Sequence, residues 1–276
     1  MALEAVQIPD DTAFLSFKHQ CESTEGWSSK YSKGGLEVWM QPTSHDAKAA
    51  GVVHKIKCKI TIKDVAAETM YDVLHDNDYR KKWDVSVIDS HDIARLTVNA
   101  DVGYYSWKCP KPLKNRDVVT LRSWLIMDNE YMIINYSVKH PDYMPRKDLV
   151  RAVSLLAGYL VKSTGEKSCT LTYLAQVDPK GSLPKWVVNK SSQYLAPKVL
   201  MKICKACRKY PDWKAKNNPH LKPWLNPEQN TLPTIHISML SIQHADSLEH
   251  IDESGLKEVK DDRGGDSDED EVNSKN

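Results

Sequence analysis

The chain has 276 residues and a formal net charge of +1 that is unevenly spread. Residues 257–276 carry four basic and eight acidic side chains, so this tail has a net charge of −4 and the first 256 residues have +5. Such a length can bury a sizeable core, and a mildly basic body suits an anionic membrane surface or an acidic ligand better than nucleic acid, which calls for a stronger basic cluster.

The sequence predicts neither a secretion signal nor a membrane span. Its start, MALEAVQIPDD, lacks a basic and apolar leader, and the longest apolar run without charges, residues 152–161, is too short to cross a bilayer. Six scattered cysteines are typical of reduced thiols. We therefore expect a cytoplasmic protein.

The first elements alternate between helix and strand signals. Residues 10–23 predict a helix with an aspartate cap, and a hairpin is expected to turn at Gly34-Gly35. In residues 53–63, isoleucines and a cysteine alternate with lysines, which predicts a strand with one buried face and one wet, basic face.

The rest of the chain predicts an α+β fold. Residues 64–76 form an amphipathic helix that Asp64 is expected to cap, and residues 183–209 form a long helix in which Pro197 should produce a kink. Between them lie strand candidates at 86–97, 101–109, 116–128, 130–139, 149–162 and 168–178. This order predicts an antiparallel sheet with helices at its ends.

We divide the chain into three parts. Residues 1–210 hold the elements above and form the domain. Residues 211–243 are a proline-rich strap whose Trp213 and Trp224 suggest packing on that domain. Residues 244–276 are polar and acidic, which predicts a disordered tail.

The stretch DNDYRKKWDVSV, residues 76–87, places Arg80 and Asp84 four residues apart on one face of a short helix. They could form a solvated surface pair, although arginine before aspartate is the weaker order and such pairs contribute only about 0.3–0.5 kcal/mol. They could instead be a buried polar feature of an apolar cavity.

Three motifs decide between these readings: DNDYRKKWD (76–84), YYSWKCPKPLKNRD (104–117) and GSLPKWVVNKSSQYLAPKVLMKICKAC (181–207). In this order they resemble the START domain, a lipid-transfer module, and its phosphatidylcholine-transfer subgroup. The resemblance covers about residues 10–210. It implies a helix-grip fold, in which a curved antiparallel sheet wraps a lipid tunnel and the C-terminal helix closes it.

The resemblance also implies a ligand site. Arg80 is expected to bind the phosphodiester of one glycerophospholipid, and Asp84 to orient Arg80. Aromatic rings cage choline in this subgroup through cation–π attraction. The matching positions here are Tyr105, Val118 and Leu155, so the cage is incomplete and we expect phosphatidylethanolamine to bind as well as phosphatidylcholine. Trp107, on the same strand face as Tyr105, is expected to serve as a substitute ring, with simple packing as the alternative. Tyr173 is expected to line the tunnel wall, although ordinary core packing would explain it equally well.

Exchange of lipid requires a gate. The helix at 183–209, with Trp186 and Val187 near its start and Pro197 as a kink, is expected to lie transiently on a membrane and lift from the tunnel mouth. A helix that only covers the core would have the same pattern. We expect a monomer that needs no metal or cofactor.

The tail contains DSDEDE, in which Ser267 directly precedes the acidic residues Asp268, Glu269 and Asp270. This pattern is typical of substrates of acidophilic, casein-kinase-type kinases. A phosphate there would add negative charge and weaken membrane association. An unmodified solvated tail is the alternative.

Other functional classes fit less well. No nucleophile elbow, phosphate-binding glycine loop or zinc-protease motif is present, so we do not expect an enzyme. Binding of nucleic acid through lysines of the long helix would require salt-dependent affinity for oligonucleotides. A lipid-sensing scaffold that recruits a protein partner remains the main alternative, because a fold alone does not separate sensing from transfer.

Overall fold

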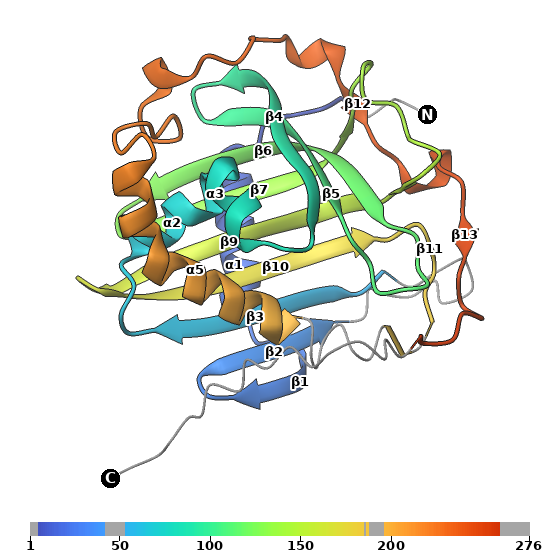
Figure 1. Ribbon diagram of the computed structural model, residues 1–276, viewed down its shortest axis with the longest axis horizontal. Helices are drawn as coiled ribbons and strands as arrows, with labels where there is room; N and C mark the ends of the chain where they lie inside the picture. Colours follow the sequence, from blue (N-terminus) through green and yellow to red (C-terminus); the bar gives the residue numbers. More distant parts are fainter. Residues whose placement is uncertain (1–4, 42–52, 185, 188–195, 260–276) are drawn as a thin grey trace.

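The structure is a computed structural model that describes residues 5–41, 53–184, 186–187 and 196–259. Its centre is one curved antiparallel sheet with the strand order β1-β2-β3-β10-β9-β7-β6-β5-β4, to which β8 is added beside β6 and β12 beside β7 (Figure 1). The strands of this sheet are β1 (Ser28–Lys33), β2 (Leu36–Gln41), β3 (Lys55–Ile62), β4 (Val87–Thr97), β5 (Ala100–Trp107), β6 (Arg116–Met127), β7 (Glu130–Lys139), β8 (Val150–Arg151), β9 (Val153–Gly165), β10 (Ser168–Asp178) and β12 (Ser241–Ile242).

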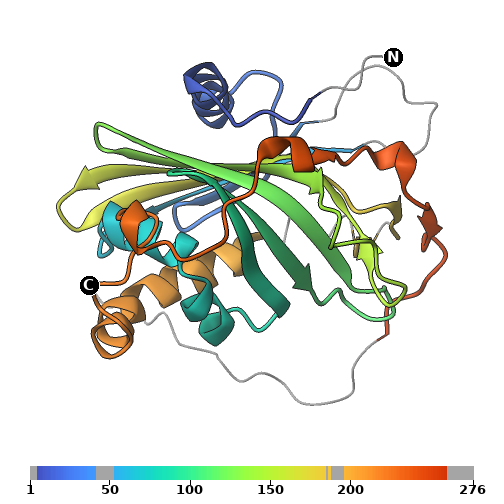
Figure 2. The ribbon, with the colours of Figure 1, turned by 90° about the horizontal axis from the view of Figure 1, so that it is seen from above.

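Helices cover both faces of the sheet. Figure 2 shows α1 (Asp11–Glu22) alone on one face, and α2 (Ala67–His75), α3 (Asn77–Trp83) and α5 (Ala196–Lys216) on the opposite, concave face. The predicted α+β helix-grip fold is therefore confirmed.

Helix α1 forms where the sequence predicted it. The side chain of Asp10 accepts a hydrogen bond from the amide of Ala13 at 2.8 Å and so caps the helix. Phe14 and Phe17 are buried against the sheet. The helix packs so closely that a Cβ at Gly158 would lie 2.8 Å from the Phe17 ring and 2.3 Å from the carbonyl oxygen of Ile133. Only glycine fits at that position of β9.

The basic face of β3 differs from the prediction, because α1 covers part of it. Lys57 is only 4% exposed, and its ammonium donates to the carbonyl oxygen of Ser23 at 2.5 Å and lies 4.2 Å from the centre of the Trp27 ring. Burial lowers the pKa of Lys57. A lysine on an alternating strand is thus not always solvated, since a helix distant in sequence can enclose it.

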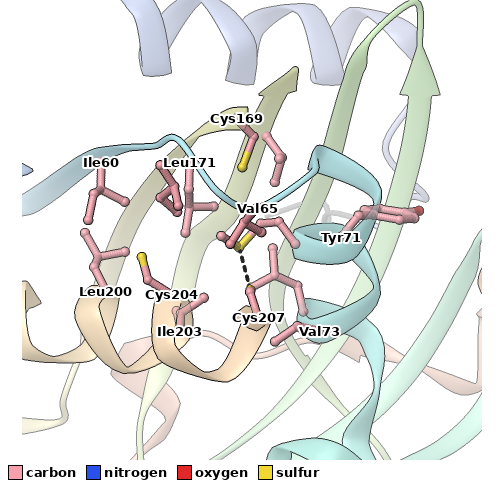
Figure 3. Close-up of a cluster of buried hydrophobic side chains, with 14 of the residues drawn as sticks. Ile60, Val65, Tyr71, Val73, Cys169, Leu171, Leu200, Ile203, Cys204 and Cys207 are labelled. Atoms are coloured by element: carbon pink, nitrogen blue, oxygen red, sulfur yellow. Dashed lines mark hydrogen bonds between the residues drawn. The ribbon is translucent and has the colours of Figure 1, made fainter. Parts of the chain in front are cut away.

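Helix α2 begins at Ala67, so Asp64 is not its cap as predicted. Asp64 instead accepts two hydrogen bonds from Arg208 of α5, at 2.6 and 3.1 Å. The main core lies between α2, α5 and the strands β3 and β10 (Figure 3). There the thiol of Cys207 contacts the sulfur of Met70 at 3.5 Å.

The described part of the long helix, α5, runs from Ala196 to Lys216 and contains Pro211. It ends seven residues later than predicted because Tyr210 and Lys214 are buried on the domain side and hold the last turns in place. Pro197 lies in the first turn of α5, and most of the predicted helix before it lies outside the described residues.

Residues 217–259, which we call the C-terminal segment, pack along the domain. The indole of Trp224 donates to Asp72 at 2.7 Å, and backbone hydrogen bonds join Arg95 to Pro233 and Ile235. The order continues past residue 244, where the sequence predicted a disordered tail, through β13 (Ile251–Asp252), which pairs in parallel with β11 (Gly181–Ser182). None of the helices that the structure describes is long and apolar enough to cross a membrane.

Candidate functional site

A cavity of about 510 Å³ lies between the concave face of the sheet and the helices α3 and α5. Its volume falls within the range of about 300–1,000 Å³ that is usual for small-molecule sites. Strands β4, β5, β6, β9 and β10 supply one wall, and the first half of α5 supplies another. Six of the seven predicted lipid-binding residues line it: Arg80, Asp84, Tyr105, Trp107, Val118 and Tyr173.

Helix α3 positions Arg80 at the cavity wall. The guanidinium donates to the carbonyl oxygen of Leu74 at 3.0 Å and lies 5.7 Å from the centre of the Trp83 ring. Burial raises the pKa of the Tyr159 phenol, and the positive charge of Arg80 opposes this effect. Arg80 is held by a backbone oxygen and lies near the Trp83 ring, in a position that faces the cavity.

Asp84 does not orient Arg80 as expected, because no ion pair joins the two side chains among the residues that the structure describes. Asp84 is the C-cap of α3 and has an extended backbone, so its side chain leaves the helical i,i+4 alignment with Arg80. Its carboxylate accepts hydrogen bonds from the hydroxyl of Ser86 at 2.5 Å and from that of Tyr105 at 3.3 Å.

Two pairs of neighbouring aromatic rings line the same cavity. Tyr105 and Trp107 stack with ring centres 5.7 Å apart, and Tyr159 and Tyr173 lie 5.0 Å apart on β9 and β10. Burial raises the pKa of the Tyr105 phenol, and the nearby carboxylate of Asp84 adds to this effect. Sequence reasoning missed Tyr159, although its position opposite Tyr173 follows from the pairing of the two strands.

The position of Leu155 shows that the prediction of a headgroup-site role for this residue is wrong. Its side chain is 47% exposed and is not among the described residues that line the cavity. The register of β9 shifts at this point, since Gln176 pairs with Leu156 while Val177 pairs with Ser154. A bulge of this kind turns the intervening side chain to the other face of the sheet. Leu155 is therefore no part of a headgroup cage.

A second polar cluster lines the cavity and was not predicted. Arg122 of β6 donates to Asp101 at 3.0 Å and to Asp92 at 3.1 Å, and Asn77 donates to Asp92 at 2.9 Å. Burial raises the pKa of Asp101 to about 6, against the opposing effect of the Arg122 guanidinium. The sequence feature that could have revealed this cluster was an arginine, Arg122, inside the largely apolar strand VVTLRSWLIM.

The predicted gate residues Trp186 and Val187 precede Pro197 in the chain, and residues 188–195 between them lie outside the described residues. The indole of Trp186 donates to the carbonyl oxygen of Leu256 at 3.0 Å, and Val187 is buried. Pro197 is buried in α5 between Ala196 and the cavity-lining Val199.

Comparisons with known proteins agree with this architecture. A family model described as the START domain matches residues 8–212. START domain-containing protein 10 from Mus musculus and that from Homo sapiens are each 65% identical over 262 residues, which covers 95% of this chain and 89% of each relative. The phosphatidylcholine transfer protein of Mus musculus is 28% identical over 143 residues, 50% of this chain and 66% of that protein.

Solved structures give the same result. The crystal structure of human STARD10 superposes with a TM-score of 0.82 at 65% identity and covers 88% of this chain and 98% of that chain. Human StAR-related lipid transfer protein 5, at 20% identity and a TM-score of 0.59, covers 72% of this chain and 93% of that chain and shares the fold. The chain belongs to the START domain family.

Proposed function

We propose that this protein binds one glycerophospholipid in the cavity and exchanges it between membranes without changing it chemically. Membership of the START family and the similarity to phosphatidylcholine transfer proteins support a lipid carrier rather than an enzyme. The observation that carries the proposal is the guanidinium of Arg80 on the cavity wall, where no carboxylate pairs with it among the described residues, whereas Arg122 pairs with Asp92 and Asp101.

The chemistry of Arg80 suits a phosphodiester. A guanidinium presents a planar fork of donors that matches phosphate oxygens, and an anion compensates the cost of its partial burial. Asp84 has no described ion pair with Arg80, so its carboxylate is placed to face the amine of a zwitterionic headgroup beside Tyr105. One end of the cavity would thus hold both charges of the headgroup.

The aromatic rings bear on headgroup choice. Tyr105 and Trp107 are stacked with each other, so together they offer one aromatic surface to a quaternary ammonium rather than a closed box. Val118 contributes an aliphatic wall, and Leu155 contributes nothing. We infer that phosphatidylcholine and phosphatidylethanolamine both bind.

The acyl chains would occupy the rest of the cavity and contact its apolar wall. Ile133, Ala157, Val177, Leu200 and Ile203 line the cavity with apolar side chains. Each CH₂ group removed from water contributes about 0.8 kcal/mol, so enclosure of the chains supplies most of the binding free energy.

Exchange would take place in the cytoplasm on transient contact of a monomer with membranes. Trp186, Val187 and Pro197 remain the proposed gate. Exposed apolar side chains next to lysines support a membrane contact near the cavity: Val85 is 69% exposed and follows the exposed Lys81 and Lys82. A kinase of the casein-kinase type would act on Ser267, which lies outside the described residues.

The test compares Arg80→Gln with Lys167→Gln, which removes one positive charge from an exposed position in the turn between β9 and β10. We expect Arg80→Gln to bind and transfer phospholipid roughly 10- to 100-fold less well, because a hydrogen bond to a charged group contributes about 1.5–3 kcal/mol. The control should behave as wild type. Transfer between donor and acceptor vesicles measures the rate, and equal transfer by the two variants would remove the role of Arg80.

Native mass spectrometry with analysis of extracted lipid identifies the ligand. One phospholipid per chain, with both choline and ethanolamine species, would support the proposal. Choline lipid alone would contradict the inference about headgroups. An absence of bound lipid after exposure to phospholipid vesicles would favour a scaffold that recruits a protein partner.

A further inference from the structure

The part of the chain that follows the START family match, which ends at residue 212, returns to the domain and adds a strand. Ile251 pairs with Gly181, and Asp252 pairs with Ser182, in a parallel two-stranded ribbon. The amide of Glu253 then donates to the carbonyl oxygen of Ser182 at 3.1 Å. Figure 1 shows β11 and β13 side by side at one end of the sheet, near the loop between β5 and β6.

Gly181 is shaped for this contact. A Cβ at that position would lie 2.2 Å from the carbonyl oxygen of Ile251, which no side chain can tolerate. The backbone of Gly181 is not in the left-handed region, so the absence of a side chain serves the close approach of β13 rather than a turn.

A buried ion pair anchors the added strand. Arg116, at the start of β6, is 1% exposed, and its guanidinium donates to the carboxylate of Glu253, which is 5% exposed. The second carboxylate oxygen accepts from the amide of Lys114 at 2.9 Å. Without Glu253, Arg116 would lose its carboxylate partner and keep the carbonyl oxygens of Lys114 and Pro179 as acceptors among the described residues. Such an unpaired buried charge is costly.

The same segment also contacts residues that precede α5 in the chain. The indole of Trp186 donates to the carbonyl oxygen of Leu256, and the hydroxyl of Ser182 pairs with His250 at 3.2 Å. Residues 250–257 therefore contact two separate parts of the domain: residues 181–187 on one side and the loop 109–115 with Arg116 on the other.

The loop 109–115 joins two strands that line the cavity, although none of its own residues is among the lining residues that the structure describes. Trp107, two residues before it, and Val118, three residues after it, both line the cavity wall. A contact that fixes Lys114 and Arg116 therefore fixes the loop that joins two cavity-lining strands.

We propose that residues 250–257 form a latch, an intramolecular strand that binds residues 181–187 and the loop 109–115 together and holds this end of the cavity closed. The ion pair between Glu253 and Arg116 anchors the latch, and the absence of a side chain at Gly181 makes room for the backbone of Ile251. Release of the latch frees the loop and speeds lipid exchange. This last consequence rests on the proposed function, whereas the coupling of the two segments does not.

Two variants release the latch by independent routes in the full-length protein. Gly181→Ala blocks the close approach of β13 to β11 and leaves the ion pair unchanged. Glu253→Gln weakens the ion pair and leaves the room at Gly181 unchanged. Glu249→Gln is the matched control, because it removes the same charge from an exposed position four residues earlier. Hydrogen exchange measured by mass spectrometry follows residues 109–116 and 250–257, and protection of β9 and β10 verifies that each variant is folded.

We expect both latch variants to exchange amide hydrogens in both segments roughly 10- to 100-fold faster, while Glu249→Gln matches wild type. Glu253→Gln acts by weakening a hydrogen bond to a charged group, and Gly181→Ala acts by the steric clash of its Cβ with the backbone of Ile251. Vesicle-to-vesicle transfer of phospholipid should accelerate in the same two variants. Faster exchange in residues 250–257 with an unchanged loop 109–116 would overturn the latch. An opened loop with an unchanged transfer rate would support the coupling and overturn the claim that release of the latch speeds lipid exchange. A wild-type protein that transfers no phospholipid would instead overturn the proposed function, and the hydrogen-exchange result would stand apart from it.

Discussion

His75 is a neutral imidazole enclosed by aromatic rings. It is 3% exposed, its ring stacks on Trp224 at 5.6 Å, and it meets Tyr71 and Trp124 edge-on at 4.5 and 5.1 Å. Its Nε2 atom has no hydrogen-bond partner in the described part of the chain. Burial holds the pKa of His75 well below its usual value, and the nearby Arg122 and Arg80 lower it further.

This environment predicts a dependence of stability on pH. Because the pKa is depressed in the folded state, the unfolded chain binds a proton below about pH 6.5 that the folded chain does not bind. The free energy of unfolding should therefore fall as the pH drops below 6.5, by up to about 1.4 kcal/mol per pH unit from this residue. His75→Phe should remove that part of the slope and leave stability at pH 7.5 within about 1 kcal/mol of wild type.

Urea unfolding followed by circular dichroism at pH 7.5, 6.5 and 5.5 measures the effect. His220→Phe, at an exposed position, is the control and should keep the wild-type slope. An unchanged slope in His75→Phe would show that other groups govern stability in acid.

At the scale of elements, one carboxylate joins α2, α3 and α5. Asp76 lies between α2 and α3, and its side chain accepts from the amide of Tyr79, the hydroxyl of Tyr210 and the ammonium of Lys214, at 2.9, 3.0 and 3.0 Å. Asp76 is 5% exposed and Lys214 is 8% exposed. The turns of α5 beyond Pro211 are thus fixed by a buried ion pair.

Asp76→Asn should destabilise the protein by about 3–5 kcal/mol, because it leaves the ammonium of Lys214 buried without its counterion. Lys214→Met in the same background should recover part of that loss. Asp64→Asn is the control, since it breaks an exposed pair between Asp64 and Arg208 on the same helix and should cost less than about 1 kcal/mol. Equal losses from the two aspartate variants, measured by urea unfolding, would contradict the role given to burial.

The elements were predictable to different degrees. Strand and hairpin positions followed from alternation and turn residues, because these signals are local. Three features were not predictable because each depends on a contact between distant parts of the chain. The burial of Lys57 depends on α1 covering β3, and the loss of Asp64 as the cap of α2 depends on its bonds with Arg208. The end of α5 depends on the contact of Lys214 with Asp76. The order of residues 245–259 likewise depends on Arg116, which lies more than a hundred residues away.

The candidate site shows the same limit. The resemblance to START domains located Arg80 and five other residues of the cavity wall, and strand alternation would have added Tyr159 opposite Tyr173. Leu155 was misplaced because one bulge reverses the alternation, and a bulge has no reliable local signal. Asp84 was predicted to contact Arg80 directly, but the backbone at the end of α3 turns the Asp84 side chain away from Arg80.

At the scale of the whole molecule, the charges of body and tail are opposed. The first 256 residues have a net charge of +5 and the last twenty have −4, so the tail reduces the attraction of the body to an anionic membrane. Ser267 stands at the start of the acidic run DEDE, where a phosphate would add about 1.5–2 negative charges.

Ser267→Glu should therefore weaken binding to vesicles that contain phosphatidylserine, by roughly fivefold for one added charge at about 1 kcal/mol per charge near the surface. Ser267→Ala should bind as the unphosphorylated wild type does. Cosedimentation at low and high salt measures both, and the difference between the variants should vanish at high salt because exposed charges are then screened. Vesicles of phosphatidylcholine alone are the control, since they lack the surface potential on which the tail acts. Equal binding of the two variants to anionic vesicles at low salt would show that the tail does not modulate membrane contact, and the basic body alone would then set it.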